Sequence, residues 1–377
     1  MKFIFTCAGT AGHINPAIAI ADKFRDMMPD SEFLFIGSGR EMENRLIPMA
    51  GYKIENIKAS GFSRGFGFEQ IKANLKSAKN ILVGSGQAKK IIKSFKPDAV
   101  IGTGGYVCYP VIKNAAKMKI PCFVHESNAI PGMATKMLDG TADKIMVAFP
   151  DLESLYKHPE RVAYTGTPIR GGFSGISKEA AVKKLGGGDK PIVVTFWGSL
   201  GASRLYEATA ELIRLNESRK AFRHVVATGG GDEGYNTMCK LLRERGVDPD
   251  EMSMTDMRKY IDDMPVVMTA SSLVLCRSGA STLGELTASG NPSILVPSPY
   301  VVDNHQEKNA RKIEKSGGAV VVTESECSGQ MLFDTICDIT QTGDKIETMS
   351  ENVRKLGVPD SADKIAELVL SMCADKK

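Results

Sequence analysis

Short apolar runs alternate with helical segments along the whole chain. Runs of this kind, each ending in a glycine-rich or polar loop, predict buried strands. The predicted strands are residues 2–7, 33–36, 99–102, 122–124 and 145–149 in the first half, and 192–196, 225–228, 273–276, 294–296 and 319–322 in the second. Two successive β/α alternations predict an α/β protein with two doubly wound, Rossmann-like domains facing each other across a cleft.

The segment 164–168 is expected to join the two domains. The first domain would then span residues 1–168 and the second residues 169–357. Apolar residues at helical spacing predict a last helix from about 361 to 373, which needs a partner surface. We expect the C-terminal segment 358–377 to pack back on the first domain.

Two further helices are expected in the first half. One runs from about Pro16 to Met27, because proline suits a first helical turn. The segment 71–95 reads as helical but carries Gly84-Ser85-Gly86, which predicts an interruption.

The segment 272–297 predicts a strand, a tight loop, a helix and a strand. Thr282 and Glu285 have the S/T-x-x-E spacing of a capping box, and Gly290 is suited to end the helix. Free N–H groups at such a helix N-terminus favour a phosphate. Glu285 therefore has two interpretations: it caps its own helix, or its carboxylate accepts hydrogen bonds from ribose hydroxyls.

Composition describes an ordinary globular protein of 377 residues, 42% hydrophobic and 24% charged. The eight cysteines include no C-x-x-C pair, so we expect neither a zinc site nor a disulfide framework, and a reducing compartment. The start is too short an apolar run for a signal peptide, and no stretch is long enough to span a bilayer.

Positive charge is concentrated in the first half. Residues 53–119 hold 13 basic and 3 acidic side chains, although the net charge of the whole chain is only +4. This asymmetry suggests an anionic partner, a phospholipid surface or a nucleic acid. The alternative is a solvated, lysine-rich helix.

The loops exclude some nucleotide-binding classes. Residues 8–13 lack G-x-G-x-x-G, the second strand ends without an acidic residue, and no P-loop pattern occurs. His13 follows the first glycine loop and is a plausible proton acceptor, or else a polar residue that holds backbone groups. His125 and Glu126 follow another strand and would line the same cleft. Asp248-Pro-Asp250 is better explained as a turn than as a metal site.

Eight motifs then occur along the chain in this order: AGTAGHINPAIAIA, GTGGYVCYP, HESNAIPG, TGTPIR, WGSLGASR, YIDDM, CRSGASTLGEL and DNHQEKNA. They resemble those of the MurG family, which transfers N-acetylglucosamine from UDP-N-acetylglucosamine to undecaprenyl-diphospho-muramoyl-pentapeptide (lipid I), giving lipid II of peptidoglycan. The resemblance covers essentially the whole chain. It implies an inverting two-domain glycosyltransferase of the GT-B type, with no cofactor and no obligate metal ion.

The resemblance also implies roles for single residues. His13 is the candidate base that would take the proton of the muramoyl 4-hydroxyl. Ser199 would approach the diphosphate, Ile261 would pack near uracil and Gln306 would contact the sugar. The whole donor set is Thr10, Ala11, Gly12, Asn128, Arg170, Ser199, Ile261, Ala280, Ser281, Thr282, Leu283, Gly284, Glu285 and Gln306. The candidate acceptor set is Gly104, Gly105, Tyr106, His125 and Glu126.

The sequence departs from the family pattern at four loop positions. Ala8 and Ala11 stand where glycine is usual, Trp197 replaces a glycine, and Leu200 stands where many members have glutamine. These changes put the fit of the donor in doubt. Two alternatives remain within reach of the same fold: a UDP-N-acetylglucosamine 2-epimerase or another lipid glycosyltransferase, and a non-catalytic nucleotide-sugar-binding subunit.

A lipid acceptor implies work at a membrane. We expect peripheral docking on the cytoplasmic face of the bacterial cell membrane, on anionic lipid rather than nucleic acid, with other cell-wall synthesis proteins as possible partners. Phe62, Phe66 and Phe68 in a glycine-rich loop would be aromatic anchors beside lysines. The alternative is that they fold inward as a lid.

Overall fold

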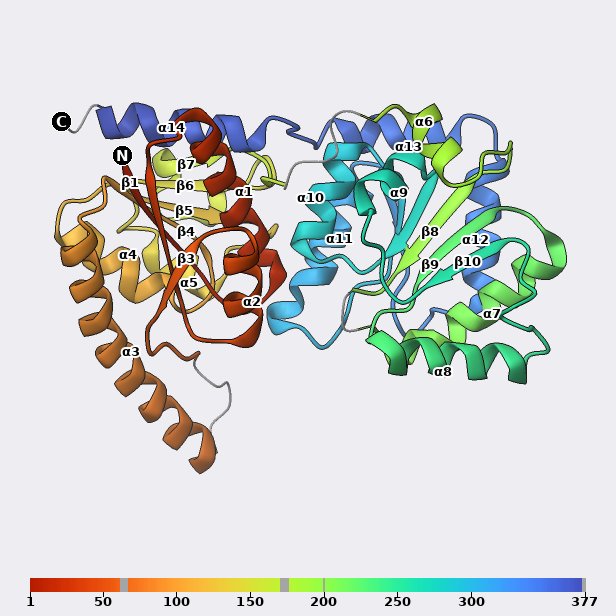
Figure 1. The fold of residues 1–377 in the computed structure, drawn as a ribbon, viewed down its shortest axis with the longest axis horizontal. Helices are drawn as coiled ribbons and strands as arrows, with labels where there is room; N and C mark the ends of the chain where they lie inside the picture. Colours follow the sequence, from red (N-terminus) through yellow and green to blue (C-terminus); the bar gives the residue numbers. More distant parts are fainter. Residues whose placement is uncertain (62–66, 170–175, 199–200, 375–377) are drawn as a thin grey trace. The chain divides into compact units, whose positions relative to one another are not determined.

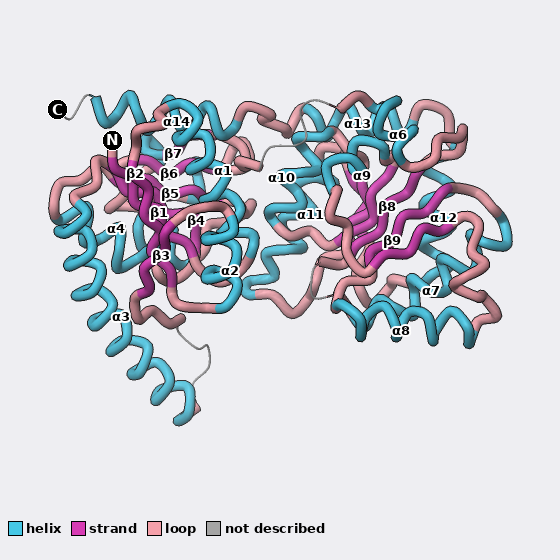
Figure 2. The backbone as a smooth tube through the Cα atoms, in the orientation of Figure 1, coloured by secondary structure: helices cyan, strands magenta, loops and turns pink. Residues whose placement is uncertain are grey.

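The computed structural model describes residues 1–61, 67–169, 176–198 and 201–374, and between residues 68 and 78 it describes only the side chains of residues 72 and 77. The chain divides into two compact units. Unit 1 comprises Met1–Arg170 and Val358–Lys377, and unit 2 comprises Gly171–Gly357. Each unit is a parallel sheet with helices on both faces (Figure 1, Figure 2). The predicted fold class, two doubly wound α/β domains, is confirmed.

Unit 1 contains a seven-stranded sheet in the order β3-β2-β1-β4-β5-β6-β7, and all its described pairings are parallel. Its elements are β1 Lys2–Cys7, α1 Ala11–Met27, β2 Glu32–Gly37, α2 Glu41–Met49, β3 Lys53–Asn56, α3 Phe68–Phe95, β4 Ala99–Gly104, α4 Cys108–Lys117, β5 Cys122–Glu126, α5 Met133–Leu138, β6 Lys144–Val147, the 3-10 turns η1 Glu153–Leu155 and η2 Pro159–Arg161, β7 Val162–Tyr164 and α14 Ser361–Ala374.

Unit 2 contains a six-stranded parallel sheet in the order β10-β9-β8-β11-β12-β13. Its elements are α6 Lys178–Lys184, β8 Ile192–Phe196, α7 Ser203–Arg219, β9 Arg223–Ala227, α8 Gly231–Glu244, β10 Thr255–Arg258, α9 Met264–Ala270, β11 Leu273–Cys276, α10 Ala280–Ser289, β12 Ser293–Leu295, η3 Val302–Asn304, α11 His305–Lys315, β13 Ala319–Val321, α12 Gly329–Gln341 and α13 Lys345–Arg354.

Strand order reverses once in each sheet. In unit 1 the reversal lies between β1 and β4, and in unit 2 between β8 and β11. Loops at the carboxyl ends of two such strands diverge and leave room for a ligand. The chain after β1 leads to His13 in the first turn of α1, β4 ends at Gly104 with Gly105 directly after it, and residues 277–279 join β11 to α10. The fold therefore brings the predicted motifs of each unit to its own switch point.

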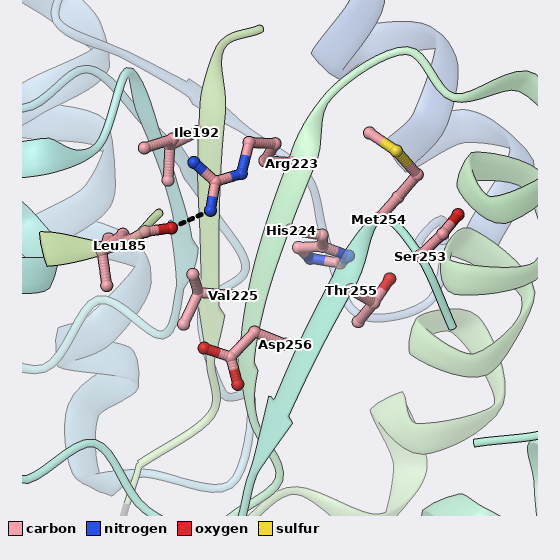
Figure 3. Close-up of a pocket in the computed structure, with 9 residues that line it drawn as sticks. All are labelled: Leu185, Ile192, Arg223, His224, Val225, Ser253, Met254, Thr255 and Asp256. Carbon is pink, nitrogen blue, oxygen red and sulfur yellow. Dashed lines mark hydrogen bonds between the residues drawn. The ribbon is translucent and has the colours of Figure 1, made fainter. Parts of the chain in front are cut away.

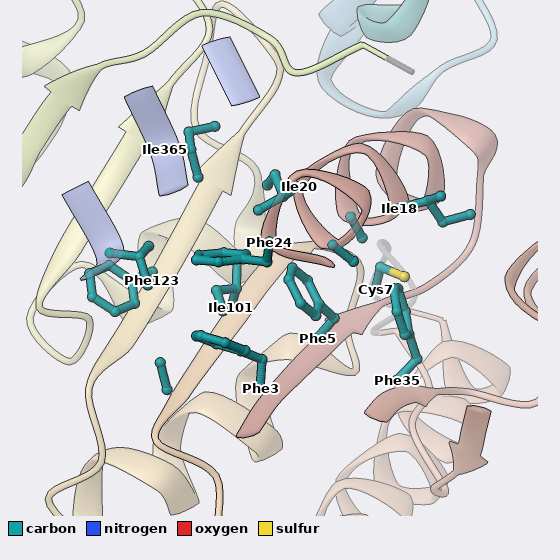
Figure 4. Close-up of a cluster of buried hydrophobic side chains, with 14 of the residues drawn as sticks. Phe3, Phe5, Cys7, Ile18, Ile20, Phe24, Phe35, Ile101, Phe123 and Ile365 are labelled. Carbon is teal, nitrogen blue, oxygen red and sulfur yellow. The ribbon is translucent and has the colours of Figure 1, made fainter. Parts of the chain in front are cut away.

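A cluster of aromatic side chains holds the first sheet to its helices (Figure 4). The rings of Phe3 and Phe24 stack with their centroids 4.5 Å apart, and those of Phe5 and Phe35 with centroids 5.2 Å apart. Ile365 of α14 belongs to the same cluster. Each fully buried side chain of this size contributes about 1.5–3 kcal/mol. The partner surface of the last helix is therefore the core beside α1.

Helix α3 is continuous through residues 84–86, so the predicted interruption is wrong. A Cβ on Gly84 would lie 2.0 Å from the carbonyl oxygen of Lys58, and Ser85 accepts hydrogen bonds from Asn114 of α4. Small residues here let the helix pack closely instead of ending it.

Other differences concern element ends and short strands. Helix α1 begins at Ala11, so Pro16 lies inside it rather than in its first turn. Strands β3, β7 and β10 have no counterpart in the sequence prediction. Each is an edge strand of three or four residues, so little of it is buried and its apolar pattern is weak.

Candidate functional site

His13 lies in the first turn of α1, directly after the glycine loop that follows β1. Its Nδ1 lies 2.8 Å from the carbonyl oxygen of Ala8. A carbonyl oxygen only accepts, so Nδ1 carries the hydrogen of this bond, and in the neutral ring Nε2 is left as the acceptor. Thr103 Oγ1 also donates to the carbonyl oxygen of His13, at 2.7 Å. The ring is thus held in the tautomer that a general base at Nε2 requires.

The second glycine loop closes on the first. A Cβ on Gly104 would lie 2.4 Å from Cδ2 and 2.7 Å from Nε2 of His13, and a Cβ on Gly105 would lie 2.6 Å from the carbonyl oxygen of Ala8. Both glycines have positive φ, +123° and +88°, which residues with side chains rarely adopt. Tyr106, which is 37% exposed, covers Gly61. The structure therefore brings Gly104, Gly105 and His13 together.

His125 and Glu126, at the end of β5, are both buried. Glu126 accepts hydrogen bonds from the backbone and side-chain amides of Asn128, from the amide of Gly132 and from Thr135 Oγ1. His125 Nε2 donates to the carbonyl oxygen of Gly166, and burial lowers its pKa. These contacts favour structural roles for both side chains, with Glu126 holding Asn128 in place.

The N-terminus of α1 presents the other predicted donor residues of unit 1. Thr10 is its N-cap residue and makes no side-chain capping bond. Its carbonyl oxygen accepts from the amides of His13 and Ile14. The first amides of a helix, here those of Ala11 and Gly12, have no acceptor within the helix.

Helix α10 begins at Ala280, with Gly279 as its N-cap residue and no side-chain capping bond. Thr282 therefore lies inside the first turn, and the predicted capping box of Thr282 and Glu285 is wrong. The first-turn amides of residues 280–282 point out of an uncapped end with no acidic side chain, which suits a phosphate. The hydroxyl of Ser281 is buried and has no hydrogen-bond partner among the described residues.

Glu285 lies one turn further along α10, partly buried. Burial raises the pKa of this carboxyl to about 7, because the charged form loses water. The predicted residues Leu283 and Gly284 are buried, and Leu283 is 1% exposed. Of these three residues, only Glu285 offers a side chain that can accept hydrogen bonds from a ligand.

Gln306, in α11, is tied to the loop before α10. The hydroxyl of Ser278 donates to the carbonyl oxygen of Gln306 at 2.7 Å. The amide of Ser298 donates to Oε1 of Gln306 at 2.9 Å. Because Oε1 is the acceptor in that bond, Nε2 is the end of the side chain that can donate to a sugar oxygen.

Arg277 lies in one of the eight motifs but was not among the residues predicted for the site. Its guanidinium donates to the carbonyl oxygen of Val296 at 3.0 Å and forms an ion pair with Glu324 at 2.5 Å. Both side chains are largely buried, 14% and 10% exposed. The pair joins the loop ahead of α10 to the ends of β12 and β13. The only signal in the sequence was a basic residue inside a loop of small residues.

Five other positions named in the sequence analysis remain. Arg170, Ser199 and Leu200 lie outside the described residues. Ile261 lies ahead of α9 and is 2% exposed. Trp197 is buried in the core of unit 2, and its Nε1 donates to Thr209 Oγ1 at 2.9 Å. The side chain that replaces a glycine in the family pattern therefore packs into the core.

A small pocket lies elsewhere in unit 2, at the amino ends of β8, β9 and β10 (Figure 3). Arg223, His224 and Asp256 are among its lining residues, and burial lowers the pKa of His224 to about 3. None of the predicted site residues lines it. Ligands of doubly wound sheets bind at the carboxyl ends of the strands. This pocket lies at the opposite edge of the sheet and is therefore not the candidate binding site.

Among the described residues, no group of three or more histidine, cysteine, aspartate or glutamate side chains could hold a metal ion. None of the helices in this part of the chain combines the length and the apolar character that a membrane span needs.

The sequence matches two family models. Residues 3–147 match the glycosyltransferase family 28 N-terminal domain, and residues 192–365 match the glycosyltransferase family 28 C-terminal domain. A relative from Acetivibrio thermocellus is 41% identical over 100% of this chain and 99% of its own length. A relative from Listeria welshimeri is 37% identical over 99% of both chains. Both are named UDP-N-acetylglucosamine–N-acetylmuramyl-(pentapeptide) pyrophosphoryl-undecaprenol N-acetylglucosamine transferase.

Solved structures give the same picture. The crystal structure of MurG from Acinetobacter baumannii superposes with a TM-score of 0.77 at 25% identity, covering 98% of this chain and 99% of that one. The UDP-GlcNAc 2-epimerase of Neisseria meningitidis superposes with a TM-score of 0.64 at 14% identity over 98% of this chain and 100% of that one. The second likeness concerns the fold alone.

Proposed function

Because this chain belongs to glycosyltransferase family 28, and within it to the MurG family, we propose that it transfers N-acetylglucosamine from UDP-N-acetylglucosamine to lipid I. The product is lipid II, the disaccharide-bearing precursor of peptidoglycan. The acceptor atom is the 4-hydroxyl oxygen of the muramoyl sugar, which attacks C1 of the donor as UDP leaves, with inversion at C1.

The observation that carries the chemistry is the hydrogen bond from His13 Nδ1 to Ala8. It leaves Nε2 as the basic nitrogen, and Nε2 takes the proton of the attacking hydroxyl. Gly104 keeps the space beside Nε2 clear of side-chain atoms. His13 is the catalytic base of this proposal.

Most of the proposed donor residues belong to unit 2. The uncapped N-terminus of α10 receives the diphosphate, whose negative charge grows as the glycosidic bond breaks. Glu285 accepts hydrogen bonds from ribose hydroxyls, and Gln306 donates through Nε2 to a sugar oxygen. Ile261 packs near uracil, Ser199 approaches the diphosphate, and Asn128, Arg170 and the α1 N-terminus complete the donor set. No metal ion is required if backbone amides and Arg170 stabilise the leaving group.

We also propose that unit 1 docks on anionic lipid at the cytoplasmic face of the membrane. Lys89, Lys90 and Lys93 are exposed on α3. Leu82 is 75% exposed and Val83 41% exposed on the same helix. Leu82 and Lys89 are seven residues apart, so they share one side of it. Apolar side chains next to lysines fit a phospholipid surface. The predicted anchors Phe62 and Phe66 lie outside the described residues, as does the side chain of Phe68.

The test is transfer itself, measured with labelled UDP-N-acetylglucosamine and a lipid I analogue. His13→Ala should lower turnover by roughly 10²–10⁴-fold and leave UDP affinity nearly intact, as loss of a general base does. His158→Ala, which removes a partly exposed histidine, is the matched control. Turnover of His13→Ala within a few-fold of wild type would remove His13 from the mechanism. UDP released without acceptor would favour an epimerase, and UDP-sugar binding without turnover would favour a binding subunit.

A further inference from the structure

Glu43, in α2, is a carboxylate with no exposed surface, 0% exposed. Its Oε1 accepts from the amide of Gly9 at 2.9 Å and from the hydroxyl of Ser38 at 2.8 Å. Its Oε2 accepts from the amides of Ser38 at 2.6 Å and Gly39 at 3.1 Å. Four donors directed at two oxygens fit an ionised carboxylate, stabilised here by backbone amides and a hydroxyl.

The amide of Gly9 belongs to the same peptide group as the carbonyl of Ala8. One side of that peptide donates its N–H to Glu43, and the other side accepts the Nδ1 hydrogen of His13. The chain of contacts is therefore carboxylate, peptide, imidazole. Each bond in such a chain polarises the next, so a charged acceptor at one end strengthens the carbonyl as an acceptor at the other.

We propose that Glu43 is a positioning residue of the transferase, acting on His13 through the Ala8–Gly9 peptide. This inference rests on the proposed role of His13 as base. When Nε2 takes the proton of the acceptor hydroxyl, the Nδ1 hydrogen stays in its bond to Ala8. The imidazolium so formed is stabilised by the polarised carbonyl and, beyond it, by the negative charge of Glu43.

The local backbone fits this role. Gly9 has φ +99°, a conformation that disfavours a side chain, and in it the N–H of Gly9 points to α2. Gly105 lies so close to the carbonyl oxygen of Ala8 that a Cβ would be 2.6 Å from it. Gly37 likewise leaves room for the carboxylate, since a Cβ there would lie 2.7 Å from Oε2 of Glu43. Three glycines thus leave room for the chain of contacts and for the backbone turn that it needs.

Other titratable groups nearby do not supply the charge. Cys7 of β1 and Cys108 of α4 lie beside the loops, and burial raises the pKa of both thiols, that of Cys108 to about 12, so both are neutral. Glu126 of β5 contributes to the raised pKa of the Cys108 thiol, and its described hydrogen bonds come from residues 128, 132 and 135. Arg40, ahead of α2, approaches Gly9, with its Nη1 3.8 Å from the position of a Cβ there. Among the groups that these contacts identify, Glu43 is the anion that reaches His13 through a peptide.

The test uses the full chain with three variants. Glu43→Gln removes the charge and keeps the size, and Glu43→Asp keeps the charge on a shorter side chain. Asp98→Asn is the matched control. Asp98 also accepts a hydrogen bond from a backbone amide, that of Lys2 at 2.8 Å, but at the amino end of β1, away from His13. The readouts are kcat and KM for UDP-N-acetylglucosamine from pH 5.5 to 9, the melting temperature, and the ¹⁵N resonances of the His13 ring.

We expect Glu43→Gln to lower kcat on the order of tenfold, while KM changes less than about twofold. The neutral imidazole becomes a weaker base when its protonated form, the imidazolium, is less stabilised. The acid limb of its pH profile should move to lower pH by roughly half a unit to one unit. Glu43→Asp should recover much of kcat, and Asp98→Asn should keep both kcat and the limb. In the wild type, the neutral ring should show Nδ1 protonated, and Glu43→Gln should weaken that preference.

Three outcomes would overturn the inference. One is an unchanged kcat in a folded Glu43→Gln variant. Another is a loss of kcat with the acid limb of the pH profile unchanged, which would mean that Glu43 only holds the loop after β1 in place. The third is a wild-type ring protonated at Nε2. Failure of the proposed function would look different, because His13→Ala would then keep its turnover. If only the role of Glu43 is wrong, His13→Ala still loses turnover. If Glu43→Gln does not fold, the kcat of Glu43→Asp and the His13 ring resonances of the wild type still test the inference.

Discussion

The imidazole of His13 occupies space that a side chain at residue 104 would need. A Cβ on Gly104 would lie 2.4 Å from Cδ2 of His13, inside the contact distance of two carbon atoms. His13 lies in the first turn of α1, which follows β1, and Gly104 is the last residue of β4. Their proximity is a consequence of the sheet order, in which β1 and β4 are neighbours.

Gly104→Ala should therefore displace the His13 ring. We expect kcat to fall by roughly 10–100-fold, because a small misplacement of a catalytic group is costly, while UDP affinity stays within a few-fold. Gly246→Ala is the control: Gly246 has φ +75° but no atom within 4 Å of its would-be Cβ. It carries the backbone strain, about 1 kcal/mol, without the collision. Equal kcat for both variants and the wild type would contradict the prediction.

Glu285 should couple donor binding to pH. Its carboxyl has a pKa of about 7 in the folded chain, above its ordinary value of 4.5. If the ionised form accepts from ribose hydroxyls, UDP binding should strengthen between pH 6 and 8. Glu285→Gln should weaken UDP binding by about 1–3 kcal/mol and flatten that dependence. Titration calorimetry at several pH values measures both, and an unchanged UDP affinity would remove Glu285 from the ribose site.

The same shift predicts the pH dependence of stability. Between pH 4.5 and 7 the folded state holds a proton on Glu285 that the unfolded state has lost, so this contribution to stability declines as pH rises through 7. Glu285→Gln removes the decline. Relative to wild type, its free energy of unfolding should rise by about 1–3 kcal/mol between pH 5 and 8.5. Denaturant unfolding at the two pH values is the measurement, and a constant difference would contradict the shift.

The ion pair of Arg277 and Glu324 should stabilise both the fold and the donor loop. Glu324→Gln leaves a largely buried guanidinium without its charged partner, which should cost about 2–4 kcal/mol. UDP affinity should also fall, because the loop before α10 loses an anchor. Glu244→Gln breaks the exposed pair with Lys240 and should cost about 0–0.5 kcal/mol. Similar unfolding curves for the two variants would refute the role of the buried pair.

Membrane docking predicts a charge-dependent interaction with lipid. Binding to vesicles should rise with the fraction of anionic lipid and fall with salt. Changing Lys89, Lys90 and Lys93 of α3 to glutamate should weaken it strongly, since each lysine near the surface adds about 1 kcal/mol. The same change at Lys178, Lys183 and Lys184 of α6 is the control. Vesicle sedimentation that is indifferent to lipid charge, salt and the α3 changes would defeat the docking proposal.

The sequence by itself determined the two doubly wound domains and most of their central strands. The reason is local: a strand buried on both faces must be apolar along its length, and β1, β8 and β11 match the prediction residue for residue. Loop motifs similarly placed the candidate residues at strand ends. Gly290 ends α10 in the left-handed conformation, as predicted, with φ +70°, because that choice depends on one residue and its neighbours.

Tertiary structure decided what depends on partners distant in sequence. Gly84 looks like a helix breaker until Lys58 is packed against it. Thr282 and Glu285 have capping-box spacing, but the helix begins earlier, so neither residue caps it. No sequence motif marked Glu43, because the amide that it binds belongs to Gly9, 34 residues away. A sequence pattern records the preference of each residue for its neighbours along the chain, whereas hydrogen bonds and close packing between loops exist only once the sheet has set the order of its strands.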